Sequence, residues 1–424
     1  MPEILVEKIV YPGKSLGRLG EIACLTDEGL PGERVEIEPR REHARLVEAR
    51  TTRILQPSPR RRAPRCGHYR ACSPYQIMDE ELQGEIKRGQ LEEILAPETA
   101  GLPPPRFTAS PQSWNYRRRA RFHVLWTPRG AQPAYNVPGT RNEFIPVDVC
   151  HLAAPPLSEL IAFALASFPC PAPGLREIEA RVGSDPSAPL LIFHWTVPPR
   201  PKDLDPVLTA LAAGPKPAGV VSVFSKRGRE EEAPVWGRDW IEETVGTAVF
   251  RIGARSFFQV NPAVLPEVVS VLAGALKAHG IRRLADLYCG LGLFGLTLAP
   301  LVESVAAVES DPQNVRLLKE NAARQKAAGV TICDGRAEEW MGWIQDRGVD
   351  AVIVDPPRKG LEPALIGALT GRPVPLVLYL SCNPTTLARD LKLLRPAYRP
   401  VQIQGFDFFP QTPHIEALAV LEKR

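Results

Sequence analysis

The sequence lacks a long apolar run, and none of its hydrophobic segments approaches the length of a membrane span. Its first residues, Met1 to Lys8, also lack the basic region and apolar stretch that a secretory signal requires. With 44% hydrophobic and 24% charged residues, the composition is typical of a globular protein. We therefore expect a cytoplasmic protein that does not enter membranes, and a monomer is the default expectation for its assembly.

Cysteine is sparse for a chain of this size, with eight residues scattered among 424. A chain of this length exceeds what one hydrophobic core supports, so we expect two or three domains that need no disulfides. In a reducing compartment such thiols stay free, and those that cluster are candidates for metal binding or catalysis.

Carboxylates are absent from two stretches, residues 51–70 and 100–142, although the net charge of the chain is only +4. Both stretches are rich in arginine, and aromatic residues interleave the second one. A solvated surface explains one such run, but two runs favour a nucleic acid, because guanidinium groups grip phosphates and aromatic rings stack on bases. The residues are Arg53, Arg60, Arg61, Arg62, Arg65 and Arg70, then Arg106, Arg117, Arg118, Arg119, Arg121, Arg129 and Arg141, with Trp114, Tyr116, Phe122 and Trp126.

The chain divides into three segments by pattern. Residues 1–56 alternate apolar and polar positions around glycine turns, which predicts a small β-barrel of the OB type. Residues 57–245 mix strand-like runs, a helical pattern and many prolines, which indicates an α+β central domain. From 246 to 424 apolar strands alternate with helical patterns, which predicts an α/β domain with a parallel sheet covered by helices.

A glycine-rich loop follows the first strand of this third segment, in the sequence Asp286 to Gly295. Gly290 and Gly292 allow a sharp turn and a close approach of the backbone to a ligand at a helix N-terminus. The next strand ends in Glu309, a carboxylate suited to ribose hydroxyls. The pattern also fits a dinucleotide site, so a nicotinamide oxidoreductase is one alternative.

Two further strands end in residues that suggest other chemistry. One ends in Asp355-Pro356-Pro357, a feature of S-adenosylmethionine-dependent methyltransferases that act on nucleic acids, and the apolar run 376–380 leads to Cys382. An inert buried thiol is the alternative for Cys382. The neighbouring motifs favour a nucleophile instead.

Five segments of the third domain resemble the RNA 5-methyluridine methyltransferase family, in the family's order. They are Ser256 to Asn261 (SFFQVN), Asp286 to Gly295, Asp355 to Gly360 (DPPRKG), Ser381 to Asp390 (SCNPTTLARD) and Phe409 to Glu416 (FPQTPHIE). Residues 1–56 are similar to the TRAM barrel of the ribosomal-RNA branch, and Tyr116-Arg117 resembles a motif of the family's central domain. The resemblance implies a Rossmann-like class I methyltransferase domain that methylates carbon 5 of uracil in RNA.

The resemblance also implies roles for single residues. Cys382 would add to carbon 6 of a flipped-out uracil, and Glu416 would remove the proton from carbon 5. S-adenosylmethionine would contact Gln259, Tyr288, Glu309 and Asp355, with the backbone of Gly290 and Gly292 nearby. Leu293 and Arg336 depart from the residues that relatives place at the cofactor. Ribosomal RNA, 23S in particular, is a more natural target than tRNA on this resemblance, and a non-catalytic RNA-binding relative is the alternative.

Members of the ribosomal branch often hold an iron-sulfur cluster on four cysteines. Cys66, Cys72 and Cys150 match three of these positions, but Tyr75 stands where the remaining ligand is expected. Three interpretations stay open: a [4Fe-4S] cluster with a ligand other than cysteine, a zinc site completed by His68 or His151, or a site with free thiols.

Overall fold

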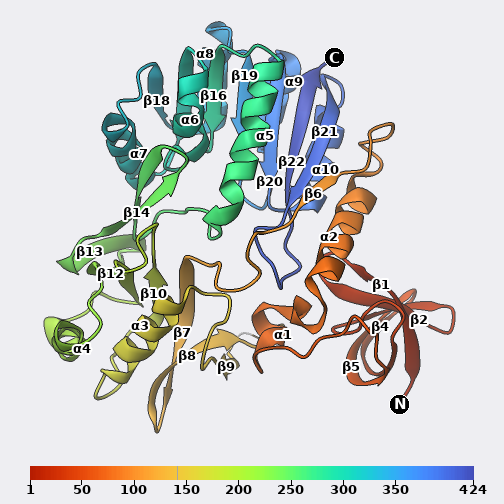
Figure 1. The fold of residues 1–424 in the computed structure, drawn as a ribbon, viewed down its shortest axis with the longest axis vertical. Helices are drawn as coiled ribbons and strands as arrows, with labels where there is room; N and C mark the ends of the chain where they lie inside the picture. The colour runs from red at the N-terminus through yellow and green to blue at the C-terminus, as the bar shows by residue number, and fades with distance from the viewer. Residues whose placement is uncertain (141) are drawn as a thin grey trace.

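The computed structural model describes residues 1–140 and 142–424, so Arg141 of the second arginine run lies outside the described residues (Figure 1). No helix in the described part of the chain is long and apolar enough to span a membrane.

The N-terminal segment is a closed barrel, as its alternating pattern predicted. Its strand order is β1-β2-β3-β5-β4. Alternate side chains turn inward to form a small core of Ile4, Val6, Cys24, Val35, Ile37 and Val47. The strands are β1 (Glu3–Val10), β2 (Lys14–Leu19), β3 (Ile22–Thr26), β4 (Arg34–His43) and β5 (Leu46–Gln56).

The central part contains a sheet of order β13-β12-β11-β10-β7-β8-β9, with α3 (Pro155–Ala166) and α4 (Pro201–Ala213) packed on one apolar core with it. Two short helical segments, α1 (Tyr69–Cys72) and η1 (Pro74–Ile77), and the longer helix α2 (Glu80–Leu95) precede this sheet in the chain. The strands are β7 (Arg119–Thr127), β8 (Gly130–Asn136), β9 (Phe144–Pro146), β10 (Leu175–Arg181), β11 (Leu190–Trp195), β12 (Gly219–Lys226) and β13 (Arg229–Gly237). The hairpin of β14 (Trp240–Val245) and β15 (Ala248–Gly253) leads to the next domain.

The carboxyl-terminal sheet has the order β18-β17-β16-β19-β20-β22-β21-β6. Strands β16 to β20 are parallel, and apolar cores on both faces explain their continuous runs of valine, isoleucine and leucine. The strands are β6 (Arg106–Thr108), β16 (Arg283–Leu287), β17 (Ser304–Glu309), β18 (Val330–Asp334), β19 (Ala351–Val354), β20 (Leu376–Ser381), β21 (Tyr398–Phe406) and β22 (Glu416–Lys423). The helices are η2 (Pro262–Val264), α5 (Leu265–Ala278), α6 (Leu293–Leu298), η3 (Ala299–Leu301), α7 (Pro312–Arg324), α8 (Ala337–Asp346), α9 (Pro363–Gly371) and α10 (Pro384–Leu394). The predicted α/β domain is confirmed.

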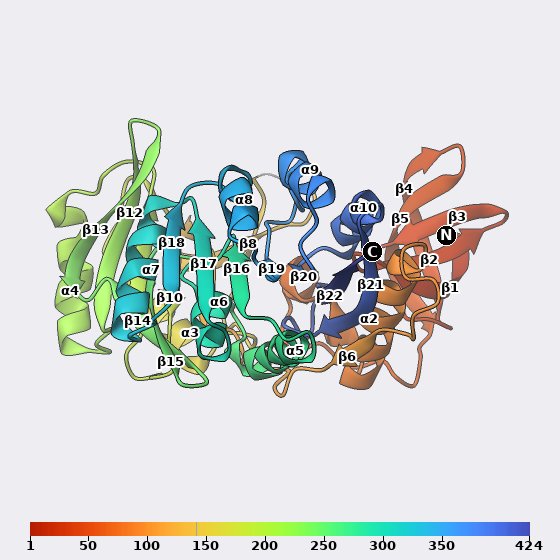
Figure 2. The same cartoon turned by 90° about the horizontal axis from the view of Figure 1, so that it is seen from above.

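Two elements from the predicted central segment pack with the carboxyl-terminal sheet. Strand β6 pairs with β21 in parallel, and α2 lies against α10, between the barrel and this edge of the sheet (Figures 1 and 2). The domain boundaries that the sequence predicts near residues 56 and 245 therefore stay predictions.

Helix α2 buries polar side chains as well as Leu91 and Leu95. Its N-terminus is capped by Asp79, whose carboxylate accepts the backbone N–H of Leu82 at 2.9 Å. Further along, Gln83, Lys87 and Gln90 lie on one face at helical spacing and are buried. These side chains bind the segment from Asp407 to Gln411 and the barrel, so α2 connects the first domain to the last.

Lys87 lies at the center of these polar side chains, and its replacement is expected to destabilise the protein strongly. Its ammonium is fully buried and donates to Asp407 Oδ1 at 2.7 Å and to the carbonyl oxygen of Phe409 at 3.0 Å. Lys87→Met leaves a buried carboxylate without its cation, which costs about 3–5 kcal/mol of unfolding free energy. Urea denaturation measures the loss.

An exposed ion pair provides the control for Lys87. Lys8 donates to Glu93 at 2.6 Å with both side chains largely in solvent, so Lys8→Met is expected to cost less than about 1 kcal/mol. Equal shifts of the urea midpoint for the two variants would contradict the structural role given to Lys87.

Candidate active site

The predicted catalytic residues lie at one edge of the carboxyl-terminal sheet. Strands β16, β17, β19 and β20 are parallel, so their carboxyl ends lie at the same edge of the sheet, here called the carboxyl edge. The residues that end or follow these strands at this edge are Tyr288, Glu309, Asp355 and Cys382. Strand β22 runs antiparallel to β20, with Ser381 opposite Ala417. Its first residue is Glu416, which therefore lies beside Cys382 at the same edge.

The electrostatics show that these groups act on one another. Burial, followed by the charges of Glu416 and Asp355, raises the pKa of Cys382 to about 11, while Arg358 opposes the shift. Burial and then Asp355 raise the pKa of Glu416 well above its usual range, and burial raises the pKa of Asp355 to about 7. Burial and the charge of Arg358 lower the pKa of His414 to about 4. His414 is therefore neutral near pH 7, which suits an orienting group better than a proton carrier.

The raised pKa of Cys382 predicts slow alkylation at neutral pH. Only about 10⁻⁴ of a thiol with this pKa is thiolate at pH 7, and the thiolate is the reactive form. We expect the rate of labelling by iodoacetamide, followed at this peptide by mass spectrometry, to rise about tenfold per pH unit up to pH 10. The exposed Cys170 is the reference thiol. If the labelling rate of Cys382 stopped rising near pH 8.5, the pKa of this thiol would be unperturbed, which would contradict the raised pKa.

The glycine-rich loop takes the left-handed conformation that its sequence predicts. Gly290 has φ of 55° and Gly292 of 86°, and a Cβ on Gly292 would lie 2.6 Å from a side-chain atom of Leu318. The loop is tied to the strand ends by carboxylates. The backbone N–H of Gly295 donates to Asp286 Oδ2 at 2.7 Å, and that of Gly290 donates to Glu309 Oε2 at 2.9 Å.

A cavity of about 350 Å³ opens beside this loop and is lined by Tyr288, Glu309, Arg336, Glu338 and Lys359, among others. The Tyr288 hydroxyl is buried and has no hydrogen-bond partner among the described residues. An unsatisfied polar group of this kind is costly unless a ligand meets it, so the residues fit a polar cofactor.

The other predicted cofactor residues, Gln259, Gly290, Gly292 and Asp355, are not in the lining of this cavity. Gln259 lines a separate space of about 20 Å³ together with Arg118 and Glu243. Leu293 is buried in the core. Arg336 lines the cavity itself, where its side chain pairs with Glu338.

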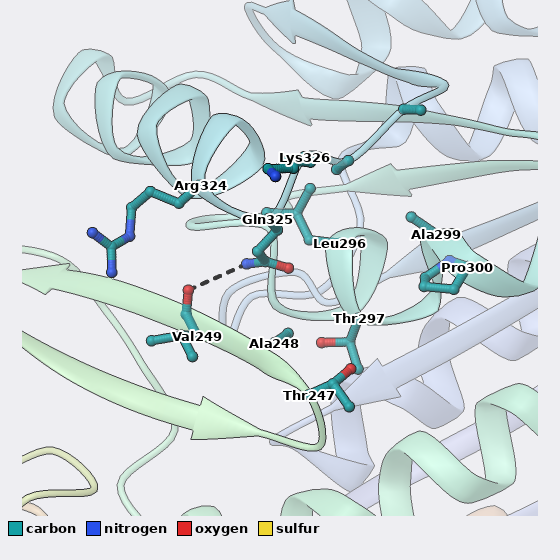
Figure 3. A pocket seen from close by; sticks show the side chains of 12 residues that line it. Thr247, Ala248, Val249, Leu296, Thr297, Ala299, Pro300, Arg324, Gln325 and Lys326 are labelled. Carbon is teal, nitrogen blue, oxygen red and sulfur yellow. Dashed lines mark hydrogen bonds between the residues drawn. The ribbon is translucent and has the colours of Figure 1, made fainter.

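A larger cavity of about 610 Å³ lies elsewhere, between the β14–β15 turn and the C-terminal ends of α6 and α7 (Figure 3). Gln325 crosses it to donate to the carbonyl oxygen of Val249 at 3.3 Å. None of the predicted site residues lines this space, so size alone does not identify the site.

The cysteine site predicted from the sequence does not fit a metal. The charges of Cys66, Cys72 and Cys150 act on one another, so the three thiols lie close together. However, no three histidine, cysteine or acidic side chains in the described chain are arranged to hold an ion. Tyr75 is buried, and its hydroxyl accepts a hydrogen bond from Gln90 at 3.3 Å.

The two histidines proposed for zinc contact aromatic rings. His68 packs on the ring of Tyr135, with the ring centroids 6.0 Å apart, and His151 meets the ring of Trp114 edge-on. Neither an iron-sulfur cluster nor a zinc ion is therefore supported by the arrangement of these residues, and we derive no chemical step through a metal.

The arginine runs are free of carboxylates in sequence but not in space. Strands and turns from other segments bring acids to most of these arginines, which reduces the charge left for RNA. The pairs are Arg60 with Asp79, Arg61 with Glu33, Arg70 with Glu28, Arg118 with Glu243, Arg119 with Glu179 and Arg121 with Glu177. Arg65 instead lies over the ring of Trp114, with 4.1 Å between its guanidinium carbon and the ring centroid.

Comparison with known proteins shows which family the carboxyl-terminal domain resembles. The model of the tRNA (uracil-5-)-methyltransferase family matches residues 227–424, which include the glycine-rich loop, Asp355, Cys382 and Glu416. An uncharacterised RNA methyltransferase of Listeria innocua is 27% identical and covers 99% of this chain and 97% of its own length. One from Thermosynechococcus vestitus is also 27% identical, with the same coverage.

Residues 227–424 match the tRNA (uracil-5-)-methyltransferase family, and the whole chain is similar to RNA methyltransferases. These matches support the predicted enzyme class, and they disfavour the nicotinamide oxidoreductase. Nothing in these matches distinguishes the ribosomal-RNA branch, which stays a prediction.

The family's fold extends over the whole chain. The Pyrococcus abyssi tRNA (uracil-54, C5)-methyltransferase, solved with S-adenosyl-L-homocysteine, superposes with a TM-score of 0.75 at 22% identity. The match covers 99% of this chain and all of that one. The barrel, the central sheet and the catalytic domain are therefore a shared architecture.

Proposed function

We propose that this protein transfers a methyl group from S-adenosylmethionine to carbon 5 of a uridine in RNA, with 23S ribosomal RNA the target rather than tRNA, as a monomer in the cytoplasm. The observation that carries the proposal is the placement of Cys382 and Glu416 side by side at the carboxyl edge, next to the glycine-rich loop. The N-terminal barrel supports a ribosomal target by its similarity to the TRAM domain.

The cavity lined by Tyr288 and Glu309 would hold the cofactor, which supplies an electrophilic methyl group when bound. Glu309 is held rigid because both of its oxygens accept backbone N–H groups, from Gly290 at 2.9 Å and from Asp311 at 2.7 Å. A fixed carboxylate can bind ribose hydroxyls without losing side-chain entropy. The Pyrococcus abyssi protein with bound S-adenosyl-L-homocysteine supports this assignment.

The chemistry begins at Cys382. Its sulfur bonds to carbon 6, and the electron pair of the carbon 5–carbon 6 double bond moves toward carbon 5 and the carbonyl oxygen on carbon 4. The thiol proton must leave, and Asp355, whose charge acts on the sulfur and whose pKa burial raises to about 7, accepts it, so that Glu416 is unprotonated for the later step.

Glu416 completes the turnover. Carbon 5 takes the methyl group and still carries its proton, which a base must remove before the sulfur can leave. A buried carboxylate with a raised pKa holds a proton strongly. Removal of the carbon 5 proton restores the double bond, and the carbon 6–sulfur bond breaks to release the thiolate.

Labelled S-adenosylmethionine and unmodified RNA test the proposal. We expect transfer to 23S ribosomal RNA, with the label recovered in 5-methyluridine after digestion. Transfer to tRNA alone would overturn the choice of target but keep the activity. RNA binding without transfer to any RNA would favour the non-catalytic alternative.

A further inference from the structure

The N-terminal barrel reaches the catalytic edge through the turn between β1 and β2. Tyr11 in this turn is half-buried and packs against the core cluster of the carboxyl-terminal domain that contains Ile415 and Ala417. These two residues flank Glu416. Gly13 of the same turn lies against Pro413, three residues before Glu416.

The docking of this turn is close and specific. A Cβ on Gly13 would lie 2.8 Å from Cβ of Pro413, so only glycine permits this approach at its φ of 95°. The carbonyl oxygen of Ile9 accepts a hydrogen bond from Gln90 of α2 at 2.8 Å. Gln90 also donates to Tyr75 at 3.3 Å, and the backbone N–H of Tyr75 donates to the carbonyl oxygen of Gln411 at 3.1 Å.

These contacts make a continuous support from the barrel to the loop that precedes Glu416. Gln83 strengthens it with reciprocal bonds to Gln411, because its amide donates to Gln411 Oε1 at 2.9 Å and its oxygen accepts the Gln411 N–H at 2.9 Å. The turn that carries Tyr11 is therefore held in one place relative to the site.

The charges that act on the Tyr11 hydroxyl include those of the predicted catalytic groups. They are the charges of Arg358, Cys382 and Glu416, and no hydrogen bond contributes. Burial raises its pKa, so the hydroxyl stays protonated and remains a donor at neutral pH. A donor that has no partner among the described residues is available to a ligand.

We propose that Tyr11 of the N-terminal barrel completes the uracil pocket and donates a hydrogen bond to a ring carbonyl oxygen of the target base. This inference rests on the proposed function. Negative charge develops on the carbonyl oxygen of carbon 4 as the Cys382 sulfur bonds to carbon 6, and a donor fixed there stabilises it. No proton is transferred, and the bond weakens again when the thiolate leaves. The barrel then supplies part of the active site as well as RNA affinity.

Tyr11→Phe tests the inference, because it removes only the hydroxyl. We expect kcat for methyl transfer to fall at least about tenfold, with KM for RNA and the affinity for S-adenosylmethionine within about twofold of wild type. The rate of covalent adduct formation with 5-fluorouridine RNA should fall by the same factor as kcat.

Tyr69→Phe is the matched control. Tyr69 is also half-buried, and its hydroxyl donates to Glu28 of the barrel at 2.8 Å. This variant should keep the wild-type kcat. If both variants behave alike, or if Tyr11→Phe changes only the urea midpoint or KM, Tyr11 has a packing role and the inference is wrong. If wild type transfers no methyl group, the proposed function fails instead.

Discussion

Cys382→Ala is expected to abolish methyl transfer, with a loss of about 10⁴-fold or more, because removal of a covalent nucleophile leaves only binding and electrostatic effects. Carbon 5 of uracil gains electron density only when the sulfur has bonded to carbon 6. Alanine leaves the fold intact, since the thiol makes no structural hydrogen bond that holds β20 to its neighbours. Incorporation of labelled methyl groups into RNA measures the loss.

Cys170→Ala controls for the substitution itself, because this thiol is exposed and lies in the central part of the chain. It should retain wild-type transfer. Transfer by Cys382→Ala at more than a few per cent of the wild-type rate would refute the nucleophile assignment.

Glu416→Gln is expected to trap the reaction after methyl transfer. The amide cannot accept the proton on carbon 5, so the sulfur cannot leave, and turnover should fall about 10²- to 10⁴-fold. A covalent protein–RNA complex should accumulate with unmodified RNA, visible as a band that survives denaturing electrophoresis. In wild type the same band should be faint, because the adduct breaks down.

Glu422→Gln provides the comparison on the same strand. Glu422 is partly exposed at the far end of β22, where it pairs with His279 at 3.0 Å. It lies away from the reaction, so its change should leave turnover intact. Loss of turnover in Glu416→Gln without any accumulated complex would place the role of Glu416 before methyl transfer.

The sequence placed Asp355 and Cys382 at one edge of the sheet because the ends of parallel strands obey a simple rule. Buried runs such as 376–380 read as strands, and the residues that follow such runs meet at one edge. Asp355 and Cys382 could be placed in this way. Glu416 could be placed only by resemblance, since nothing in its local pattern shows that β22 runs antiparallel to β20.

Helix α2 shows where local pattern gives no guidance. Its buried residues include Gln83, Lys87 and Gln90 together with Leu91 and Leu95, so polar positions interrupt the apolar stripe by which an amphipathic helix is recognised. The charged partner, Asp407, lies 320 positions away in the chain. Only the tertiary fold shows that these polar residues are interior.

Long-range pairing also explains two other differences. The arginine runs look like free positive charge, but Arg119 and Arg121 on β7 form ion pairs with Glu179 and Glu177 on the adjacent strand β10. Tyr75 looked like a lost metal ligand, and it is a packed support between α2 and Gln411. In both cases the partner comes from a distant segment, which periodicity and spacing do not reveal.

Mass spectrometry of the complex with 5-fluorouridine RNA tests the central claim most directly. Fluorine cannot leave carbon 5 as a proton does, so the adduct persists once the methyl group has been transferred. After protease and nuclease digestion, we predict one nucleotide-linked peptide that contains Cys382, with a mass that includes the added methyl group. A linkage through any other residue, or no covalent complex from an RNA that wild type methylates, would contradict it.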